Sequence, residues 1–448
     1  MSWKEYYDSR VVSAAEAVKH IQSGWKMSVG HACAAPMVLV DALMERKDEI
    51  NEVQITHMVP LTPAPYCEEP YCQSFRHVSV FAGGSTRGAI NAGRADYIPR
   101  LFRKIPGLFT ETFPLDAAFI KVSPPDKHGY MSLGISVDYS KEAVKRAKFV
   151  VAEISSFVPR TLGDSFVHVS EVDYFVVSHA PLVELPPPVL TDVEMGIGKH
   201  VASLIKDGDC LQLGIGAIPD AVLRFLTEKN DLGIHSEMIS DGVMQLVKSG
   251  NINCSRKSLH PNQITFTFAA GSQEFYDWMD KNPMLLGLDV EYLNDPFIIA
   301  KNDNMVSING AVSVDLLGQV SADSVAGKHW SGAGGQVDFV RGAIRSKGGR
   351  SFIALPATAK GGAFSRIVAH LDPGQTITTS YYDVDHIVTE YGVAKLFGKS
   401  LSYRRHALIE IAAPQFRDQL REESKQRHPY IKADACKIRQ HEDRKHLM

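Results

Sequence analysis

The chain lacks any apolar run of about eighteen residues, the length that a membrane-spanning helix needs. Its first residues, Met1-Ser2-Trp3-Lys4-Glu5, contain no apolar signal-peptide core. Neither sign of charge is in excess, since 48 Lys and Arg residues stand against 51 Asp and Glu residues, for a net charge of −3. We therefore expect a cytoplasmic protein with no membrane or nucleic-acid partner.

Cysteine is also scarce and scattered. Only Cys67 and Cys72 lie close together, and a Cys-x4-Cys spacing without a second pair or a nearby histidine is a poor zinc signal. We expect no metal site and six reduced thiols, at Cys33, Cys67, Cys72, Cys210, Cys254 and Cys436.

The length of 448 residues is too great for one ordinary core and predicts two domains of about 200 residues each. Three consecutive prolines, Pro186-Pro187-Pro188, cannot continue a helix or a central strand, and they stiffen an extended segment. We expect an α/β domain over residues 1–185, a linker over 186–190, a second α/β domain over 191–425 and a charged tail over 426–448.

The two predicted domains share one layout. In each, a helical run ends at a glycine, Gly24 or Gly208, and the short strand-like run that follows ends at Gly30 or Gly214. Both pairs are 184 residues apart (208 − 24 and 214 − 30), and a proline near the start of a new helical run follows in each case. This pattern predicts two copies of one α/β unit; chance recurrence of a common unit is the alternative.

Short apolar runs alternate with helical patterns elsewhere in the chain. Residues 117–122 and 149–154 are typical of covered parallel strands, and residues 141–147 between them favour a helix. This alternation predicts the α/β fold class with mostly parallel sheets. Ligands on such sheets bind beyond the carboxyl ends of the strands, where both Gly214 and Glu237 fall.

The first candidate binding element is the turn Gly214-Ile215-Gly216-Ala217-Ile218, which stands between a strand-like run and a helix start. Its glycines let the backbone approach a ligand, and the free N–H groups of the helix suit an oxyanion or a phosphate. It is not a P-loop, because no Gly-Lys-Ser/Thr follows, and Pro219 replaces the third glycine of the dinucleotide fingerprint. A purely structural turn is the alternative.

Glu237 places one carboxylate where a buried strand-like run breaks into small and polar residues. A lone acid at such an edge is costly unless its charge is used, so a nucleophile or a general base is indicated. No third acid or histidine at ligand spacing accompanies Glu237 and His235, so these residues do not indicate a metal site. A structural hydrogen-bonding acid is the alternative.

Three further clusters combine glycines with polar side chains. Gly334 and Gly335 precede a strand-like run, and Lys360 lies on a glycine-containing loop where it could meet a phosphate or a carboxylate. The segment Ser85-Thr86-Arg87 sets an arginine, suited to carboxylate capture, among small residues. Ordinary turns and a surface lysine are the alternatives.

Five segments in order resemble motifs of the acetyl-CoA hydrolase/transferase family, the glutamate-dependent class I CoA-transferases. The resemblance runs from about Tyr6 to about Leu420, and the nearest subgroup is similar to 4-hydroxybutyrate and butyryl-CoA:acetate CoA-transferases, with an itaconate-activating branch also similar. It implies two similar open α/β/α domains with the active site between them. The segments are 122–126, 212–219, 235–238, 334–339 and 388–394.

The resemblance also implies a chemistry. Glu237 would form a glutamyl-CoA thioester in a ping-pong reaction between an acyl-CoA and a short-chain carboxylic acid, without a metal. Coenzyme A would be a substrate, and homo-oligomers are common in this class. Residues implied at the CoA and oxyanion site are Gly214, Ile215, Gly216, Ala217, Ile218, Asn309, Gly334, Gly335 and Lys360.

The acid acceptor is left open by two departures from the hydroxybutyrate-type pattern. The loop 359–366 is shorter, and the segment 60–65 is rich in proline. A dicarboxylate acceptor would require a second cationic side chain in the substrate pocket, which Arg87 or Arg366 could supply. Ser85 and Thr86, next to Arg87 in the sequence, are candidate residues of the same pocket. The alternatives to a transferase are an acyl-CoA hydrolase of the same fold, a non-catalytic CoA-binding sensor and a sugar-phosphate isomerase on a related fold.

Overall fold

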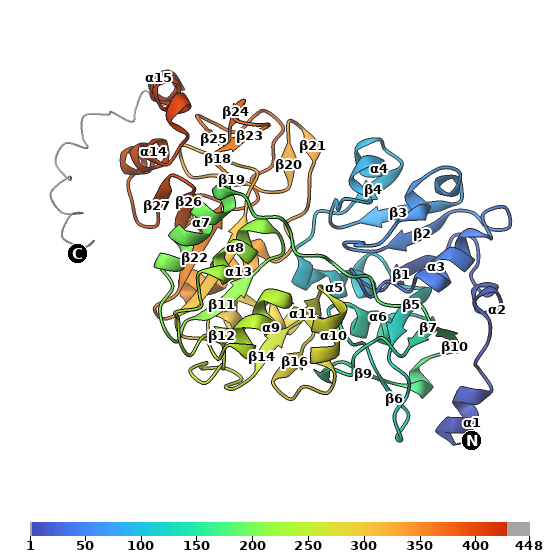
Figure 1. The fold of residues 1–448 in the computed structure, drawn as a ribbon. Helices are drawn as coiled ribbons and strands as arrows, with labels where there is room; N and C mark the ends of the chain where they lie inside the picture. The colour runs from blue at the N-terminus through green and yellow to red at the C-terminus, as the bar shows by residue number, and fades with distance from the viewer. Residues whose placement is uncertain (1, 428–448) are drawn as a thin grey trace.

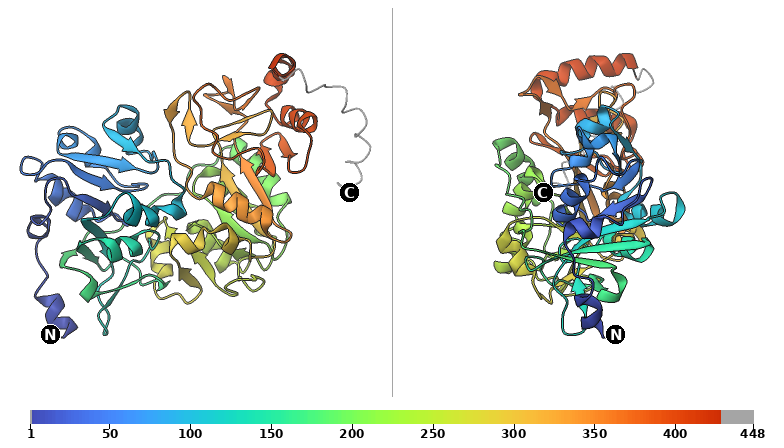
Figure 2. Two further views of the ribbon diagram at one scale, coloured as in Figure 1. Left: turned by 180° about the vertical axis from the view of Figure 1, so that it is seen from behind. Right: turned by 90° about the vertical axis from the view of Figure 1, so that its right-hand side faces the viewer.

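The computed structural model describes residues 2–427, which form two α/β halves lying side by side (Figure 1). The N-terminal half is blue to teal in Figure 1 and the C-terminal half is green to red, and the views in Figure 2 keep the same arrangement. Apart from its first two residues, the predicted tail 426–448 lies outside the described residues, which end with helix α15 (Arg417–Arg427).

The N-terminal half is built on a seven-stranded sheet in which every neighbouring pair of strands is parallel. Parallel pairing requires crossover connections, and these bring helices onto the faces of the sheet. The strands, in sheet order, are β10 (Tyr174–Ser178), β7 (Phe149–Ser155), β5 (Ala117–Val122), β1 (Lys26–Val29), β2 (Val53–Thr56), β3 (Phe75–Ser79) and β4 (Ala95–Tyr97).

Both faces of this sheet are covered. All six residues of β5 are buried, and alternate residues point to opposite faces. Ala118 and Ile120 lie in one core with helices α5 (Ile105–Glu111) and α6 (Ser140–Arg146). Ala117 and Phe119 lie in another core with helices α2 (Ala14–Val18) and α3 (Met37–Met44). The sequence predictions of strands at 117–122 (β5) and 149–154 (β7) and of a helix at 141–147 (α6) are confirmed to within a residue.

The C-terminal half is built on a six-stranded sheet with the same kind of layers. Its neighbouring strands are parallel except for the last pair. In sheet order the strands are β12 (Gly233–Ile234), β11 (Cys210–Leu213), β17 (Met305–Gly310), β22 (Arg350–Ala354), β26 (His386–Thr389) and β27 (Gly392–Lys395).

Helices again pack on both faces of the sheet. Phe352 and Ala354 of β22 share a core with helices α7 (Asp192–Ser203) and α8 (Ala217–Arg224). Ile353, which points the other way, shares a core with helices α13 (Gln336–Arg345) and α14 (Leu401–Glu410). The predicted α/β class with mostly parallel sheets is confirmed.

The structure also confirms the repeat. Strands β1 and β11 begin 184 residues apart, at Lys26 and Cys210, and each is preceded by a glycine with positive φ, Gly24 at 76° or Gly208 at 79°. The two strands occupy equivalent places in their sheets, because β1 lies between β2 and β5 while β11 lies between β12 and β17. The same order continues outward through β7 and β10 in one half and through β22 and β26 in the other.

The two halves are joined by more than the linker. Residues 179–191 contain no helix or strand, as the prolines predict. Strand β8 (Leu162–Gly163) of the N-terminal half pairs with β16 (Leu285–Gly287), which pairs with β14 (Ile264–Phe266). One hydrophobic core runs through both halves. The predicted domain boundaries themselves stay predictions.

Three negative observations apply to residues 2–427. No helix there has the length and apolar character needed to cross a bilayer. No three His, Cys, Asp or Glu side chains in this range are grouped so that they could hold a metal ion. The five cysteines of this range form no disulfide, and Cys436 lies outside it.

Candidate active site

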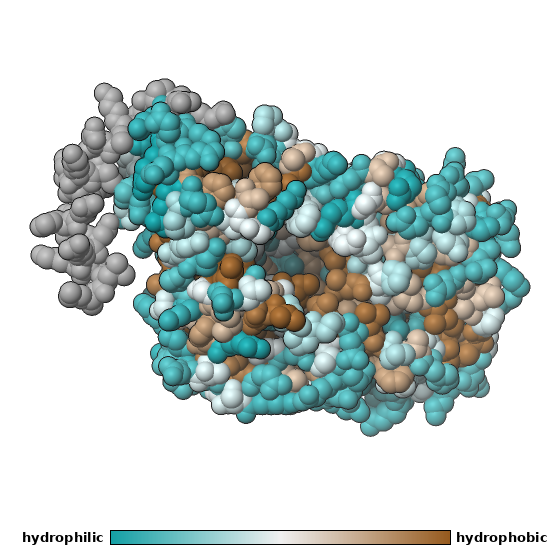
Figure 3. All heavy atoms as spheres, turned by 45° about the horizontal axis from the view of Figure 1, so that its top comes forward, coloured by the Kyte–Doolittle hydropathy of each residue, from teal (hydrophilic) through white to brown (hydrophobic). Residues whose placement is uncertain are grey.

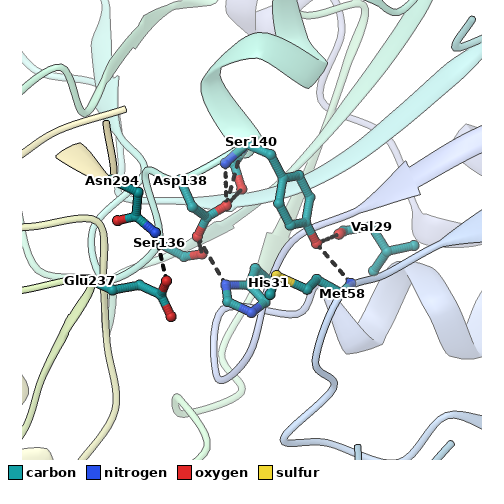
Figure 4. Close-up of polar contacts among 9 residues, drawn as sticks. Val29, His31, Met58, Ser136, Asp138, Ser140, Glu237 and Asn294 are labelled. Atoms are coloured by element: carbon teal, nitrogen blue, oxygen red, sulfur yellow. Dashed lines mark hydrogen bonds and ion pairs between the residues drawn. The ribbon is translucent and has the colours of Figure 1, made fainter. Parts of the chain in front are cut away.

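Glu237 lies between two short strands, β12 and β13 (Met238–Ile239), at the carboxyl end of the C-terminal sheet. Its backbone carbonyl accepts hydrogen bonds from the N–H groups of Thr267 (3.0 Å) and Phe268 (3.1 Å). Strand β12 stops before Glu237, and Figure 4 shows the Glu237 side chain extending toward His31 of the N-terminal half. The backbone is thus fixed while the carboxylate projects from a sheet edge, the position predicted for a ligand site.

One hydrogen bond holds the Glu237 carboxylate. Nδ2 of Asn294 donates to Oε2 over 2.6 Å, and Asn294 itself caps the end of helix α11 (Val290–Leu293). Gly335 fits against the same oxygen so closely that a Cβ atom at this position would overlap it and would lie 2.6 Å from Nδ2 of Asn294. Gly335 is also the N-cap of helix α13, whose positive end therefore faces the carboxylate.

Burial changes the acidity of Glu237. Part of the residue is exposed, yet protein surrounds its carboxyl group, and this desolvation raises the pKa of Glu237 to about 7. The hydrogen bond from Asn294 lowers this pKa, while the charges of Asp338 and Asp138 raise it. A carboxylate with such a pKa is a stronger nucleophile than an ordinary one and is ionised in about half of the molecules at neutral pH.

An ion pair between the halves lies close to this acid. Nε of Arg103 donates to Oδ1 of Asp338 over 2.8 Å, and Asp338 is almost completely buried in the first turn of helix α13. Desolvation raises the pKa of Asp338 to about 6 against the opposing effect of Arg103. The pair fixes the start of helix α13, and with it Gly335, relative to the N-terminal half.

The predicted turn Gly214-Ile215-Gly216-Ala217-Ile218 stands next to Glu237. The Ser236 hydroxyl donates to the Leu213 carbonyl over 3.0 Å and accepts from the Leu213 N–H over 3.2 Å, which joins the residue before the acid to the residue before the turn. Gly216 has φ of 113° and begins helix α8, so a side chain there would be strained. Ile215 and Gly216 line a cavity of about 870 Å³ together with the proline-rich linker and helix α9 (Asp241–Lys248).

The second glycine cluster also reaches the acid, but its surroundings differ from the prediction. Gly334, with φ of 51°, and Gly335 both face Glu237. The run after them is helix α13 and not a strand, so the strand-like interpretation was wrong. The first residues alternate in polarity as a strand does, but Val337, Val340 and Ala343 recur at helical spacing and are buried.

Asn309 and Lys360, which were both predicted at the CoA site, have different surroundings. Asn309, near the end of β17, exchanges side-chain hydrogen bonds with Gln212 of β11, two residues before Gly214. Lys360 follows β23 (Thr358–Ala359) in an exposed hairpin, and its ammonium group lies 5.4 Å from the ring centroid of Phe364. The first residue therefore adjoins the glycine turn, while the described contact of Lys360 is within its own hairpin; CoA binding by either residue stays a prediction.

The segment Ser85-Thr86-Arg87 lies at the junction of the halves. The Arg87 guanidinium stacks on Trp330 at 4.1 Å, and Trp330 belongs to the loop that leads to Gly334. The Ser85 hydroxyl donates to the Pro60 carbonyl, and the Thr86 hydroxyl is buried without a partner among the described residues. Figure 3 shows a face of the molecule that is hollowed between the halves, with hydrophobic residues at the edge of the hollow.

Several residues at this centre carried no sequence signal. Asn294 looks like an ordinary helix cap, and Asp338 looks like an ordinary first-turn acid. His31 and Asp138 of the N-terminal half are 107 positions apart, yet their side chains meet near Glu237 (Figure 4). Both ring nitrogens of the fully buried His235 have partners other than Glu237, because Nε2 lies 2.8 Å from the Leu293 carbonyl and Nδ1 lies 3.1 Å from the Thr265 hydroxyl.

Comparison with known proteins gives this geometry its class. The model of the acetyl-CoA hydrolase/transferase N-terminal domain matches residues 1–185, and that of the C-terminal domain of the same family matches residues 271–424. The chain belongs to the acetyl-CoA hydrolase/transferase family.

The similar curated and solved proteins narrow the class. The chain is 53% identical over 428 residues to a 4-hydroxybutyrate coenzyme A transferase of Clostridium kluyveri, covering 95% of this chain and 100% of that one. A 4-hydroxybutyrate CoA-transferase structure from Porphyromonas gingivalis matches with 41% identity and a TM-score of 0.82, covering 95% and 100%. RipA from Yersinia pestis matches with 36% identity and a TM-score of 0.89, covering 96% and 100%. The chain is an enzyme, a CoA-transferase.

Proposed function

We propose that this CoA-transferase moves CoA between an acyl-CoA and a short-chain carboxylic acid through a covalent thioester on Glu237. The observation that carries this proposal is the Glu237 carboxyl group, which projects from a sheet edge against Gly335 with a pKa raised to about 7. A purely structural acid would gain more from an ordinary pKa and a full set of hydrogen-bond partners than this residue has.

The first half-reaction has two steps. Glu237 attacks the thioester carbonyl of the acyl-CoA and expels the CoA thiolate, which gives a mixed anhydride between Glu237 and the acyl group. The thiolate then attacks the glutamyl carbonyl of this anhydride, which leaves a Glu237–CoA thioester and the free carboxylate. A second carboxylate repeats both steps in reverse, and no net proton or electron is gained or lost.

Each tetrahedral intermediate needs a donor for its oxyanion. The Asn294 amide already donates to Glu237, Gly335 at the start of helix α13 lies against the same carboxylate, and the N–H groups of the turn after Gly214 are further candidate donors. The backbone donors among them are held by the helix starts, so they would need little reorganisation during the reaction. The glycines at 214, 216, 334 and 335 would let the bulky acyl-CoA approach them.

The anhydride would hydrolyse in the presence of water, so the site has to exclude it once the substrate is bound. The desolvated Glu237 carboxyl and the almost fully buried Asp338 in the first turn of helix α13 are consistent with a low-water site. CoA would extend from Glu237 past the Gly214 turn and Asn309, and Lys360 would meet it farther out. The acid would occupy the junction of the halves, with Ser85, Thr86 and Arg87 as candidate contacts.

The names of the relatives indicate the acids to try. The similar proteins include CoA-transferases named for 4-hydroxybutyrate, for butyrate with acetate and for succinate with cyclohexane-1-carboxylate. We propose a short-chain acid of this range as the acceptor; a dicarboxylate such as itaconate would need Arg87 or Arg366 as a second cation. A cytoplasmic location and a homo-oligomer also stay predictions.

The test separates transfer from hydrolysis. Purified enzyme is incubated with butyryl-CoA, with and without acetate, and acetyl-CoA, butyrate and free CoA are measured. The proposal predicts acetyl-CoA formation that depends on acetate, with little free CoA in its absence, and loss of this exchange in Glu237→Gln. CoA release at the same rate without any acid would support the hydrolase, and unchanged exchange in Glu237→Gln would refute the nucleophile.

A further inference from the structure

Asn294, the hydrogen-bond donor to Glu237, is weakly anchored by its own side chain. Its Nδ2 donates to Glu237 (Figure 4), but its Oδ1 is buried without a hydrogen-bond partner among the described residues. The position of the amide therefore depends on the backbone at the end of helix α11. This helix has four residues, and the carbonyls in the last turn of a helix have no partner within the helix itself. A group outside helix α11 has to hold its end.

His235 supplies that anchor. Its ring is fully buried, and its Nε2 lies 2.8 Å from the carbonyl oxygen of Leu293, the residue before Asn294. A carbonyl oxygen can only accept a hydrogen bond, so Nε2 carries the proton and donates it. Burial lowers the pKa of His235 to about 3, and the charges of Lys257 and His260 act in the same direction. The ring is therefore neutral near pH 7, and its Nδ1 is an acceptor.

Two further side chains fix this tautomer. The Thr265 hydroxyl lies 3.1 Å from Nδ1 of His235 and 3.5 Å from the Ile234 carbonyl, so its one proton is better placed on the ring nitrogen. Nζ of Lys257 donates to Oγ1 of Thr265 over 3.3 Å and to two backbone carbonyls, each over 2.7 Å. The hydrogen bonds therefore run in one direction, from the Lys257 ammonium group to the Leu293 carbonyl.

We propose that His235 is a positioning residue, which holds the Asn294 amide on the Glu237 carboxylate through the Leu293 carbonyl. This inference rests on the proposed function, in which Glu237 is the nucleophile. Without the donor at Nε2, the Leu293 carbonyl would be buried without that partner, and the end of helix α11 would move to find another. The amide would then leave the carboxylate, and the ionised form of Glu237 would lose a donor that stabilises it.

Two variants of His235 separate the roles of the ring nitrogens. In His235→Gln the amide nitrogen can take the place of Nε2 and donate to the Leu293 carbonyl, whereas in His235→Asn the shorter side chain reaches only the place of Nδ1. The rate of the first half-reaction is measured against pH by stopped flow. We expect its midpoint to stay within about 0.3 pH unit of the wild-type value in His235→Gln and to rise by about 1 unit in His235→Asn. An unchanged midpoint in His235→Asn overturns the proposal.

The variants leave the other charges around the carboxylate in place. Asp338 pairs with Arg103, and Asp138 pairs with His31. The charges of both acids raise the pKa of Glu237. The substituted ring is neutral, so a shift of the midpoint reports a hydrogen bond and not a change of charge.

A double variant shows whether the effect passes through Asn294. His235 also packs edge-on against Phe339 of helix α13, with centroids 6.2 Å apart, and Asp338 of this helix acts on the charge of Glu237. If His235 acts through Asn294, the midpoint of His235→Asn/Asn294→Leu equals that of Asn294→Leu alone. Shifts that add in the double variant would overturn the proposal, because the effect would then reach the carboxylate by another path.

His77→Leu is the matched control for the loss of a buried histidine. His77 is also fully buried, with Nδ1 3.0 Å from the Ile55 carbonyl, but it lies in strand β3 of the N-terminal sheet. We expect His77→Leu to lower Tm and to leave the midpoint unchanged. An equal midpoint shift in His77→Leu and His235→Asn would show general loosening of the fold and would overturn the proposal.

Nitrogen NMR of the histidine-labelled wild-type enzyme tests the direction of the hydrogen bonds without a loss of folding. The chemical shifts of the ring nitrogens distinguish a protonated from an unprotonated atom, and the signals of His235 are those that disappear in His235→Gln. The proposal predicts a proton on Nε2 and none on Nδ1 near pH 7. A proton on Nδ1 alone would leave Nε2 unable to donate and would overturn it.

The two levels of the account fail separately. If labelled CoA becomes attached to Glu237 but the midpoint of His235→Asn stays at the wild-type value, the proposed reaction stands and the role of His235 is refuted. If no CoA becomes attached to Glu237 with any acyl-CoA, the proposed reaction itself is refuted.

Discussion

Substitution of Gly335 by alanine tests the fit between the loop that contains Gly334 and Gly335 and the carboxylate of Glu237, the proposed nucleophile. The φ of Gly335 is −95°, which any L-residue adopts, so the backbone can accept alanine. The added Cβ would overlap Oε2 of Glu237 and would lie 3.1 Å from Cδ of Glu237 and 2.6 Å from Nδ2 of Asn294. Ordinary contact between such atoms needs about 3.5 Å, so the carboxylate oxygen has to move by at least about 1 Å.

The size of the effect follows from that displacement. A nucleophile misplaced by about 1 Å loses about 100-fold in rate, which corresponds to about 2.7 kcal/mol of transition-state stabilisation. We therefore expect kcat/KM of Gly335→Ala to fall by about that factor with every acid tested. The overall structure should persist, because the overlapping atoms are the ends of two side chains and not the backbone.

The assay is steady-state exchange between butyryl-CoA and acetate, with circular dichroism to confirm folding. Gly88→Ala is the matched control, because a Cβ at this position in helix α4 (Arg87–Asn91) meets no atom within 4 Å. Full activity in folded Gly335→Ala would show that the carboxylate adjusts freely or is not the reacting group. Equal losses in both alanine variants would show that the effect is not local to Glu237.

Other perturbations test the charges around the site. The rate of the first half-reaction should rise with pH through a midpoint of about 7, because Glu237 must be ionised, and a stopped-flow profile without such a midpoint would contradict this. Asn294→Leu removes a donor to the ionised form, so the same midpoint should move upward by about 1–2 pH units; a downward shift would be inconsistent with the hydrogen bond. Arg103→Met leaves Asp338 buried without its cation and should lower the free energy of unfolding by about 1–3 kcal/mol. The raised pKa of Asp338 makes its ionisation unfavourable to folding, so the decrease in Tm should be larger at pH 8 than at pH 5, and the opposite order would be evidence against the pair.

The fold was predictable because its signals are local. The helix–glycine–strand–glycine layout predicted two similar units, and the structure has them at β1 and β11 with the same sheet order around each. The absence of helix and strand around the three prolines and the covered strand β5 followed from local sequence pattern. The interpretation of residues 336–339 as a strand failed because four residues are too few to separate a period of two from a period of 3.6.

The site was predictable only in part, for a physical reason. Glu237 and the glycines could be selected as candidates because an isolated acid and paired glycines are unusual in their own segments. Asn294, Asp338 and His31 lie near Glu237 because the fold brings them together across distances that local patterns do not report. Caps, first-turn acids and buried histidines are common, so none of these residues stands out before the chain is folded.

The most direct test of the account is to locate the covalent intermediate. The enzyme is mixed with acyl-CoA in the absence of an acceptor acid, reduced with borohydride and digested, and its peptides are analysed by mass spectrometry. The account predicts reduction of the Glu237 side chain to an alcohol in the peptide that contains His235-Ser236-Glu237-Met238, with no such change in Glu237→Gln. Modification of a different residue, or an unmodified enzyme that still exchanges CoA at full rate, would contradict it.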